Sequence, residues 1–259
     1  MQNNKEMRVK ALIRTSIFAS IMLFSCRSNY EVTGFEAKRI EITNRLDAKI
    51  NKEAEAILAP YREQVEKEMN TVIGESEIFM TSHHPQSLLS NFVADVLYEE
   101  ALQYDSQVSF AVINTGGLRA GMPKGNVTIK NIFEITPFEN TLTIVELTGE
   151  QIMMLMQNLA QVNGEGISNR LQLVISKTRT VVSAKIDGKD IIPSATYKVA
   201  TLDYLAEGND KLVAFKLSKN VNKPEGATIR QLTINHIKQK TREGKKLTSK
   251  LDNRLTVAE

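Results

Sequence analysis

A segment that follows an apolar run carries side chains suited to binding an anion. Residues 108–113 read as a buried strand that ends at Asn114, and Gly116, Gly117 and Arg119 follow within five positions. Glycine adopts backbone angles that are closed to other residues and lets a ligand approach the main chain. Arginine binds phosphate or carboxylate through two parallel hydrogen bonds. This spacing indicates an anion-binding loop, although an ordinary surface loop also fits these residues.

A second turn presents an aromatic ring. It begins at Pro137, whose ring restricts the backbone, and continues through Phe138, Glu139 and Asn140. Together with Arg119, this turn suggests a phosphate site beside an aromatic platform. The alternative, from the residues alone, is that Phe138 packs inside the protein.

These two segments resemble motifs of one known family. Residues 114–119 read Asn-Thr-Gly-Gly-Leu-Arg, similar to the Asn-Gly-Gly-Gly-Ile-Arg signature of the C-terminal domain of 5'-nucleotidases and UDP-sugar hydrolases. Residues 137–142 read Pro-Phe-Glu-Asn-Thr-Leu and resemble the Pro-Phe-Gly-Asn segment of that family. The similarity extends to residues 90–95 and 197–210, so it covers about residues 54–259.

The resemblance implies a role for individual residues. In that family two aromatic rings enclose the nucleotide base, and Phe138 and Tyr204 fall on these positions. Asp210 falls where an aspartate accepts hydrogen bonds from the ribose hydroxyls, and Arg119 falls where an arginine contacts phosphate. Further substrate contacts are implied for Asn114, Gly116, Gly117 and Asn140. On the residues alone, Tyr204 could equally be a packed ring and Asp210 a turn-forming carboxylate.

The sequence departs from the family pattern at three positions that bear on phosphate binding. Thr115 stands in place of a glycine, which predicts either no positive φ there or strain of about 1–2 kcal/mol. Glu139 replaces a glycine and adds negative charge, and Pro85 falls where the family has an arginine. The neighbouring His83 or His84 could take that place, although neutral imidazole is a weaker partner for phosphate. We do not expect them to bind metal, because zinc sites need three or four ligands.

Motifs for hydrolysis are missing from the sequence. The resemblance implies that catalysis in this family belongs to a separate N-terminal metallophosphoesterase domain, which holds two metal ions with clustered Asp, His and Asn ligands. The chain contains no Asp-x-His, Gly-Asn-His-Asp/Glu or Gly-His-x-His motif, no Gly-x-Ser-x-Gly elbow and no phosphate-binding Gly-Lys-Ser/Thr loop. We therefore expect no catalytic residue and no cofactor in this chain, with divalent metals only in a partner catalytic chain.

The N-terminal region has the pattern of a lipoprotein signal peptide, residues 1–25. Four basic residues precede a short apolar run at residues 15–24, which is too short to cross a bilayer. Cys26, the only cysteine, follows at the expected cleavage point and would carry the lipid. Phe24 is bulkier than such sites usually contain, and the alternative is an uncleaved or ordinary signal with an incidental cysteine. The pattern predicts export and a lipid anchor in the bacterial cell envelope, on its periplasmic face.

Net charge gives no reason to expect a nucleic-acid partner. The chain has 33 basic and 30 acidic residues, for a net charge of +3. Removing residues 1–25 leaves 29 of each, so the positive excess belongs to the targeting segment.

The remaining chain predicts one α+β domain. Residues 26–53 should form a tether and helix, and residues 54–259 a single domain with a mixed β-sheet and packed helices, as the resemblance also implies. Apolar residues at helical spacing predict two exposed, amphipathic helical segments between residues 36 and 70, with a break or a kink at Pro60. Asp187 and Gly188 predict a hairpin turn.

Three functions fit these observations. The first is the substrate-binding component of a 5'-nucleotidase-type phosphohydrolase in nucleotide catabolism, acting with a separate metallophosphoesterase chain and not catalytic alone. The second is a lipoprotein that binds nucleosides or nucleotides without catalysis. The third is a structural lipoprotein in which the binding loops have decayed.

Overall fold

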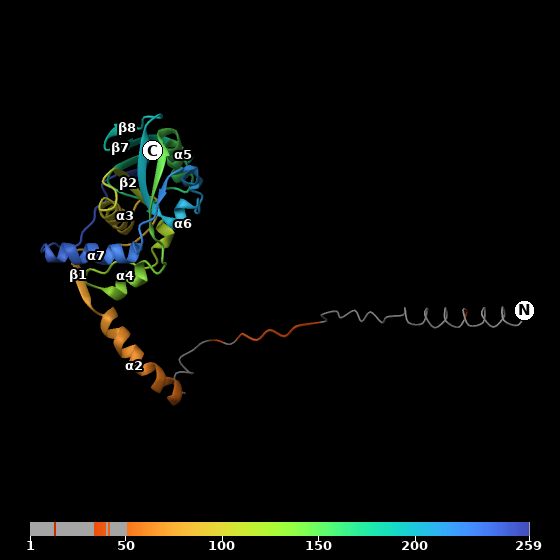
Figure 1. The fold of residues 1–259 in the computed structure, drawn as a ribbon, viewed down its shortest axis with the longest axis vertical. Helices are drawn as coiled ribbons and strands as arrows, with labels where there is room; N and C mark the ends of the chain where they lie inside the picture. Colours follow the sequence, from red (N-terminus) through yellow and green to blue (C-terminus); the bar gives the residue numbers. More distant parts are fainter. Residues whose placement is uncertain (1–12, 14–33, 40, 42–50, 259) are drawn as a thin grey trace, which may run out of the picture. The chain divides into compact units, whose positions relative to one another are not determined.

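A computed structural model describes residues 13, 34–39, 41 and 51–258 (Figure 1). Cys26 and nearly all of the expected signal peptide therefore lie outside the described residues. The chain divides into two compact units, residues 1–52 and 53–259, and the description below concerns the second.

Helices and strands interleave along the second unit. The helices are α2 (Lys52–Met69), α3 (Leu88–Ala101), α4 (Ile129–Ile135), α5 (Gly149–Gln161), α6 (Asp203–Ala206) and α7 (Ile229–Arg242), with 3₁₀ turns η2 (Thr115–Gly117) and η3 (Val213–Leu217). The strands are β1 (Val72–Ser76), β2 (Val108–Ile113), β3 (Gly125–Thr128), β4 (Leu142–Thr148), β5 (Gly166–Ile167), β6 (Leu171–Ile175), β7 (Val181–Ile186), β8 (Lys189–Asp190), β9 (Thr196–Leu202), β10 (Val221–Asn222) and β11 (Leu255–Val257). Among the described residues, no helix is long and apolar enough to cross a membrane.

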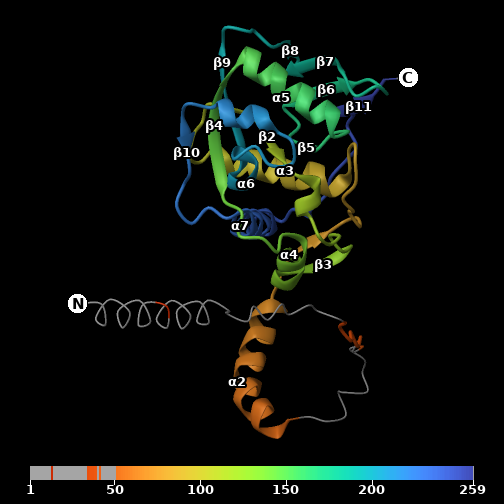
Figure 2. The ribbon, with the colours of Figure 1, turned by 90° about the vertical axis from the view of Figure 1, so that its right-hand side faces the viewer.

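The strands form three sheets, two of them mixed. The largest has the order β10-β4-β9-β2-β5, in which β2 and β9 are parallel and the other pairs antiparallel. The second sheet has the order β11-β6-β7-β8, with β11 parallel to β6 (Figure 2). Strands β1 and β3 form the third, a two-stranded antiparallel sheet. The expected α+β class with packed helices is confirmed, although the strands are shared among three sheets.

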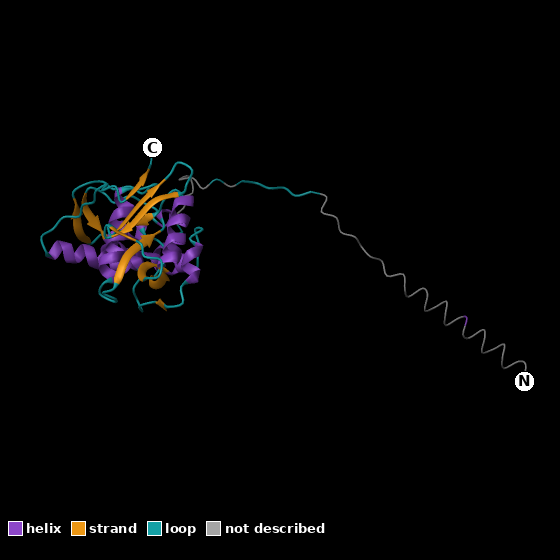
Figure 3. Ribbon diagram, turned by 90° about the horizontal axis from the view of Figure 1, so that it is seen from above, coloured by secondary structure: helices purple, strands orange, loops and turns teal. Residues whose placement is uncertain are grey.

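Both faces of the five-stranded sheet are buried, and helices flank its strands (Figure 3). Because side chains alternate between the faces of a strand, Ala111 and Ile113 of β2 pack with α3 and α7. Phe110 and Val112 pack on the opposite face with α5 and η3. Burial on both faces explains why β2 reads as a continuous apolar run rather than an alternating one.

Hydroxyl caps fix where three of the helices begin. The side chains of Ser87, Thr128 and Thr148 accept the backbone N–H three residues later, at the starts of α3, α4 and α5. In each case the residue at that third position also accepts the N–H of the cap, which satisfies two free amides. The cap at Thr128 thus sets the start of α4, which leads directly into the Phe138 turn.

The expected break of the helix at Pro60 is wrong. One helix, α2, runs from Lys52 to Met69 through Pro60, while residues 42–50 lie outside the described range. Proline removes one intrahelical hydrogen bond. Because α2 buries none of its residues, water can hydrate the carbonyl that loses its partner.

Candidate functional site

The loop after β2 is a tight right-handed turn. The amide of Gly117 donates to the carbonyl of Asn114 at 3.1 Å, and neither Gly116 nor Gly117 has a positive φ. The expectation that these glycines serve special backbone angles is therefore wrong, and Thr115 fits the turn without such strain. Space is what matters at Gly117, where a Cβ would lie 3.0 Å from Oδ1 of Asn114; a Cβ at Gly116 would meet nothing within 4 Å.

A buried carboxylate that the sequence analysis missed anchors this loop. Glu165 is 7% exposed and accepts the Thr115 amide N–H at 2.5 Å. Burial raises the pKa of Glu165, and the hydrogen bonds from Thr115 and the nearby His84 oppose that rise. Ser82 donates its hydroxyl to the Thr115 carbonyl at 3.3 Å, so Thr115 is held on both sides. The signal in the sequence was an acidic residue between Gly164 and Gly166 at the start of β5.

The two aromatic residues lie at the same end of the same pair of strands. Leu142 at the start of β4 pairs with Leu202 at the end of β9. Phe138 precedes the first of these residues by four positions, and Tyr204 follows the second by two. Both rings are partly solvent-exposed, at 48% for Phe138 and 39% for Tyr204, so neither is an interior packing residue. The Thr141 amide also donates to the Asp203 carboxylate at 3.1 Å, which joins the two turns.

Asp210 connects the second turn with the loop after β2. Its Oδ1 accepts the Tyr204 hydroxyl at 3.0 Å, and its Oδ2 accepts the Asn114 side-chain amide at 2.9 Å. The hydrogen bond to Asp210 raises the pKa of the Tyr204 phenol. Gly208, Asp210 and Lys211 have φ values of 76°, 51° and 65°, so the left-handed residues of this turn lie on either side of Asn209 and not at Asn209 itself. Three of the predicted site residues therefore form one hydrogen-bonded group.

Arg119 has its charge available to a ligand. Its side chain is exposed and donates from Nη1 to the Gly116 carbonyl at 3.3 Å. Its amide donates to the Ile135 carbonyl at 2.9 Å, which ties the loop to the end of α4. Within residues 51–258 no carboxylate forms an ion pair with this guanidinium.

Glu139 does not point a free negative charge at the site. Its carboxylate forms an ion pair with Arg230 of α7, which was not identified from the sequence. The negative charge of Glu139 is therefore paired with a positive charge beside the aromatic turn.

Asn140 contributes to a pocket with a mainly apolar lining. The pocket is lined by Val93, Ile113, Asn114, Gly117, Leu118, Thr136, Phe138, Asn140, Leu202 and Ile229. Four predicted site residues thus line one small pocket, whose volume of about 10 Å³ is that of a single water molecule. Within it, Oδ1 of Asn114 is buried and has no hydrogen-bond partner among the described residues.

The adjacent histidines have different surroundings. His84 Nδ1 lies 2.7 Å from the Gly164 carbonyl, which requires the proton on Nδ1. Both histidines are exposed, but His84 is bonded to Gly164 beside Glu165, whereas His83 Nδ1 lies 3.3 Å from the carbonyl of its neighbour His84. In the described part of the chain, no group of three His, Cys, Asp or Glu side chains could hold a metal ion.

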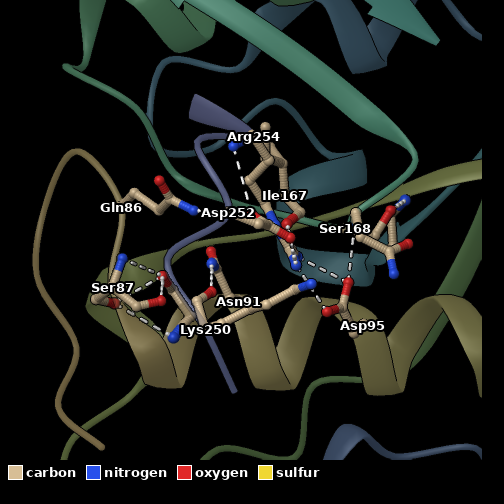
Figure 4. A network of polar contacts seen from close by, with 12 residues as sticks. Gln86, Ser87, Asn91, Asp95, Ile167, Ser168, Lys250, Asp252 and Arg254 are labelled. Atoms are coloured by element: carbon tan, nitrogen blue, oxygen red, sulfur yellow. Dashed lines mark hydrogen bonds and ion pairs between the residues drawn. The ribbon is translucent and has the colours of Figure 1, made fainter. Parts of the chain in front are cut away.

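A second polar network has a structural role away from the ligand loop (Figure 4). Arg254 donates to both carboxylate oxygens of Asp95 at 2.8 and 2.9 Å and to the Ile167 carbonyl at 2.9 Å. Asn91 donates to the Lys250 carbonyl at 2.9 Å. The motif at residues 90–95 therefore fastens the C-terminal segment and β5 to α3.

Comparisons with known proteins agree on one family. Residues 72–217 match the family described as 5'-nucleotidase, C-terminal domain. The chain is 29% identical over 184 residues to the trifunctional nucleotide phosphoesterase protein YfkN of Bacillus subtilis (strain 168), covering 64% of this chain and 12% of that protein. It is 24% identical over 163 residues to protein UshA of Escherichia coli (strain K12), covering 62% and 30%.

Solved structures give the same fold. The 5'-nucleotidase precursor from Thermus thermophilus superposes with a TM-score of 0.68 at 24% identity, covering 81% of this chain and 44% of that one. The NAD nucleotidase of Haemophilus influenzae gives a TM-score of 0.62 at 17% identity, covering 81% and 42%. The chain thus spans less than half the length of each of these proteins.

Proposed function

This chain belongs to the 5'-nucleotidase C-terminal domain family, and from that premise we propose that it is the nucleotide-specificity component of a 5'-nucleotidase-type phosphohydrolase. Its role is to bind the nucleoside part of a nucleotide and present the phosphate to a catalytic centre. The hydrolysis belongs to a separate metallophosphoesterase chain, which supplies the divalent metals, and this chain is not catalytic alone.

One observation carries the proposal: two partly exposed rings and a carboxylate gather at the end of one strand pair. Phe138 and Tyr204 flank the paired ends of β4 and β9, and Asp210 is hydrogen-bonded to Tyr204. Stacking of a base on aromatic rings is worth about 1–3 kcal/mol per base, whatever the identity of the base.

Polar groups at the same site would orient the rest of the nucleotide. Asp210 would accept the ribose hydroxyls, and the Asn114 amide that donates to Asp210 would hold this carboxylate in place. Arg119, exposed and without an acidic partner in residues 51–258, would bind the phosphate. The ion pair between Glu139 and Arg230 supports this assignment, because it lowers the repulsion that an unpaired Glu139 would exert on phosphate.

We place the protein in the cell envelope, exported and anchored by lipid at Cys26. The basic and apolar pattern before Cys26 supports this placement. Metabolic labelling with a radioactive or alkyne-bearing fatty acid tests it: Cys26→Ser should abolish incorporation of the label.

Binding by the chain alone tests the nucleotide site. Calorimetry with adenosine, AMP and UDP-glucose should show binding, and Phe138→Ala or Tyr204→Ala should weaken it about 5- to 150-fold, the range that corresponds to the stacking energy. Tyr61→Ala is the matched control, because Tyr61 is an exposed ring on α2. Unchanged affinity in both site variants would reject the pocket.

Activity with a partner separates the remaining functions. Mixing this chain with separately encoded metallophosphoesterases should produce AMP hydrolysis that chelators abolish. If the chain binds nucleotides but no partner produces activity, the non-catalytic lipoprotein is favoured. If the chain shows no binding and no activity, the structural lipoprotein remains.

A further inference from the structure

The turn that presents Phe138 is held by one guanidinium from α7. We infer that Arg230 is a positioning residue for nucleoside binding: it fixes the backbone of residues 136–139 so that the Phe138 ring is preorganised to stack on a base. This inference rests on the proposed function and adds a residue outside the family motifs described above.

Arg230 contacts four consecutive residues of the turn. Its Nε donates to the Thr136 carbonyl at 3.0 Å, and its Nη2 donates to the carbonyls of Pro137 and Phe138 at 2.7 and 3.3 Å. Its Nη1 donates to the Glu139 carboxylate. Arg230 is itself only 9% exposed, so these contacts compete little with water. All three guanidinium nitrogens are thereby committed to the turn.

Neighbouring helices hold the guanidinium in place. The Phe133 ring of α4 lies under it, with 4.2 Å from Arg230 Cζ to the ring centroid. The amide of Ile229, one residue before, donates to the Asn140 carbonyl at 2.9 Å. Helices α4 and α7 are in contact (Figure 2). The turn is therefore fastened at both ends to the start of α7.

The Phe138 side chain needs such support because it makes little packing of its own. It is 48% exposed, and an exposed ring on a loose turn must be ordered each time a base binds. Pinning the backbone removes that cost in advance. Lysine cannot reproduce the contacts, because a single ammonium group lacks the planar fork that reaches several acceptors at once.

Glu139 belongs to the same set of contacts between Arg230 and the turn. Its side chain is 73% exposed, yet its carboxylate forms an ion pair with Arg230. Glu139 therefore helps to hold the turn in place. Its negative charge is paired with Arg230 and does not lie free beside the phosphate site. Glu139→Gln should loosen the turn less than loss of Arg230, because the three carbonyl contacts remain.

A double-mutant cycle between positions 230 and 138 tests the inference on the full chain. Arg230→Met should raise the dissociation constant for adenosine roughly tenfold, the size typical of coupling between residues in contact. In a Phe138→Ala background the same substitution should have no further effect, since the ring it positions is gone. Arg230→Lys should resemble Arg230→Met. Arg242→Met, at the exposed end of the same helix, should leave affinity unchanged.

A residue that only stabilises the fold would give another pattern. Arg230→Met would then lower the melting temperature while leaving adenosine affinity unchanged, or it would weaken affinity equally in both backgrounds; either result overturns the inference. If Arg230→Met does not fold, the cycle is run with Glu139→Gln, for which a smaller loss that vanishes without Phe138 is expected and additive losses overturn it. Failure of the wild-type chain to bind adenosine or AMP would instead reject the proposed function itself.

Discussion

Replacing Glu165 tests how a buried carboxylate supports the ligand loop. Glu165→Ala would leave the buried Thr115 N–H, now bonded at 2.5 Å, without its acceptor. An unsatisfied buried donor costs about 1–3 kcal/mol, and the deleted methylene and carboxylate groups leave a cavity. Glu165→Gln keeps an acceptor oxygen and nearly the same volume, removes the charge and replaces the second oxygen by an NH₂ donor. The two variants therefore separate the hydrogen bond from the ionisation.

The stability of the wild-type protein relative to Glu165→Gln should fall as pH rises. Burial raises the pKa of Glu165 above its ordinary value of 4.5, against the hydrogen bonds from Thr115 and the charge of His84. The folded protein thus holds this proton more tightly than the unfolded chain does. That stabilisation is fully present below the unfolded pKa and is lost as pH rises through the folded pKa. Glutamine does not titrate, so the difference in the free energy of unfolding reports Glu165 together with its electrostatic interactions with His84 and Asp210.

Urea unfolding followed by circular dichroism between pH 4 and 8 measures that difference. Asp95 also has a pKa raised by burial, but it is present in both proteins and cancels in the comparison. A difference that stays constant or increases with pH would refute the reasoning, because it would mean that the contacts of Thr115 and His84 outweigh burial. Glu165→Ala should be the least stable of the three proteins at pH 7.

Three further predictions follow from the geometry. Gly117→Ala should destabilise the protein by about 1 kcal/mol in urea unfolding, because its Cβ would press on an amide oxygen 3.0 Å away, whereas Gly116→Ala should be neutral; equal effects would contradict the spacing. Asp210→Asn should lower the pKa of the Tyr204 phenol, seen as one tyrosine titrating earlier in ultraviolet absorbance, and an unchanged titration curve would exclude that hydrogen bond. Arg254→Met should lower the free energy of unfolding by about 3–5 kcal/mol, because it leaves the half-buried carboxylates of Asp95 and Asp252 without their ionic partner, and a loss below about 1 kcal/mol would show that water replaces the guanidinium.

The sequence by itself determined the family and the main elements. The apolar run at residues 108–113 predicted a buried strand, and it became β2, buried on both faces. The motif order predicted the 5'-nucleotidase C-terminal domain, which is confirmed. Asp187 and Gly188 predicted a hairpin, and they join β7 to β8 with φ 51° and 73°. The strand and the hairpin are specified by propensity and spacing within a few residues, and the family by the types and order of several short motifs along the chain.

Tertiary structure alone decided how the site is supported. Arg230 meets Glu139 across 91 positions of sequence, and Glu165 meets Thr115 across 50. No local pattern marks such pairs, because each depends on which helices and strands the fold brings together. Context also reversed two local rules. Helix α2 continues through Pro60, where its exposed surface leaves the freed carbonyl open to water, and Gly117 has no positive φ but lies close to the Asn114 side chain. Neighbouring residues determine local steric preferences, so these can be read from the sequence. Burial and long-range pairing arise only when the chain packs, so they require the tertiary structure.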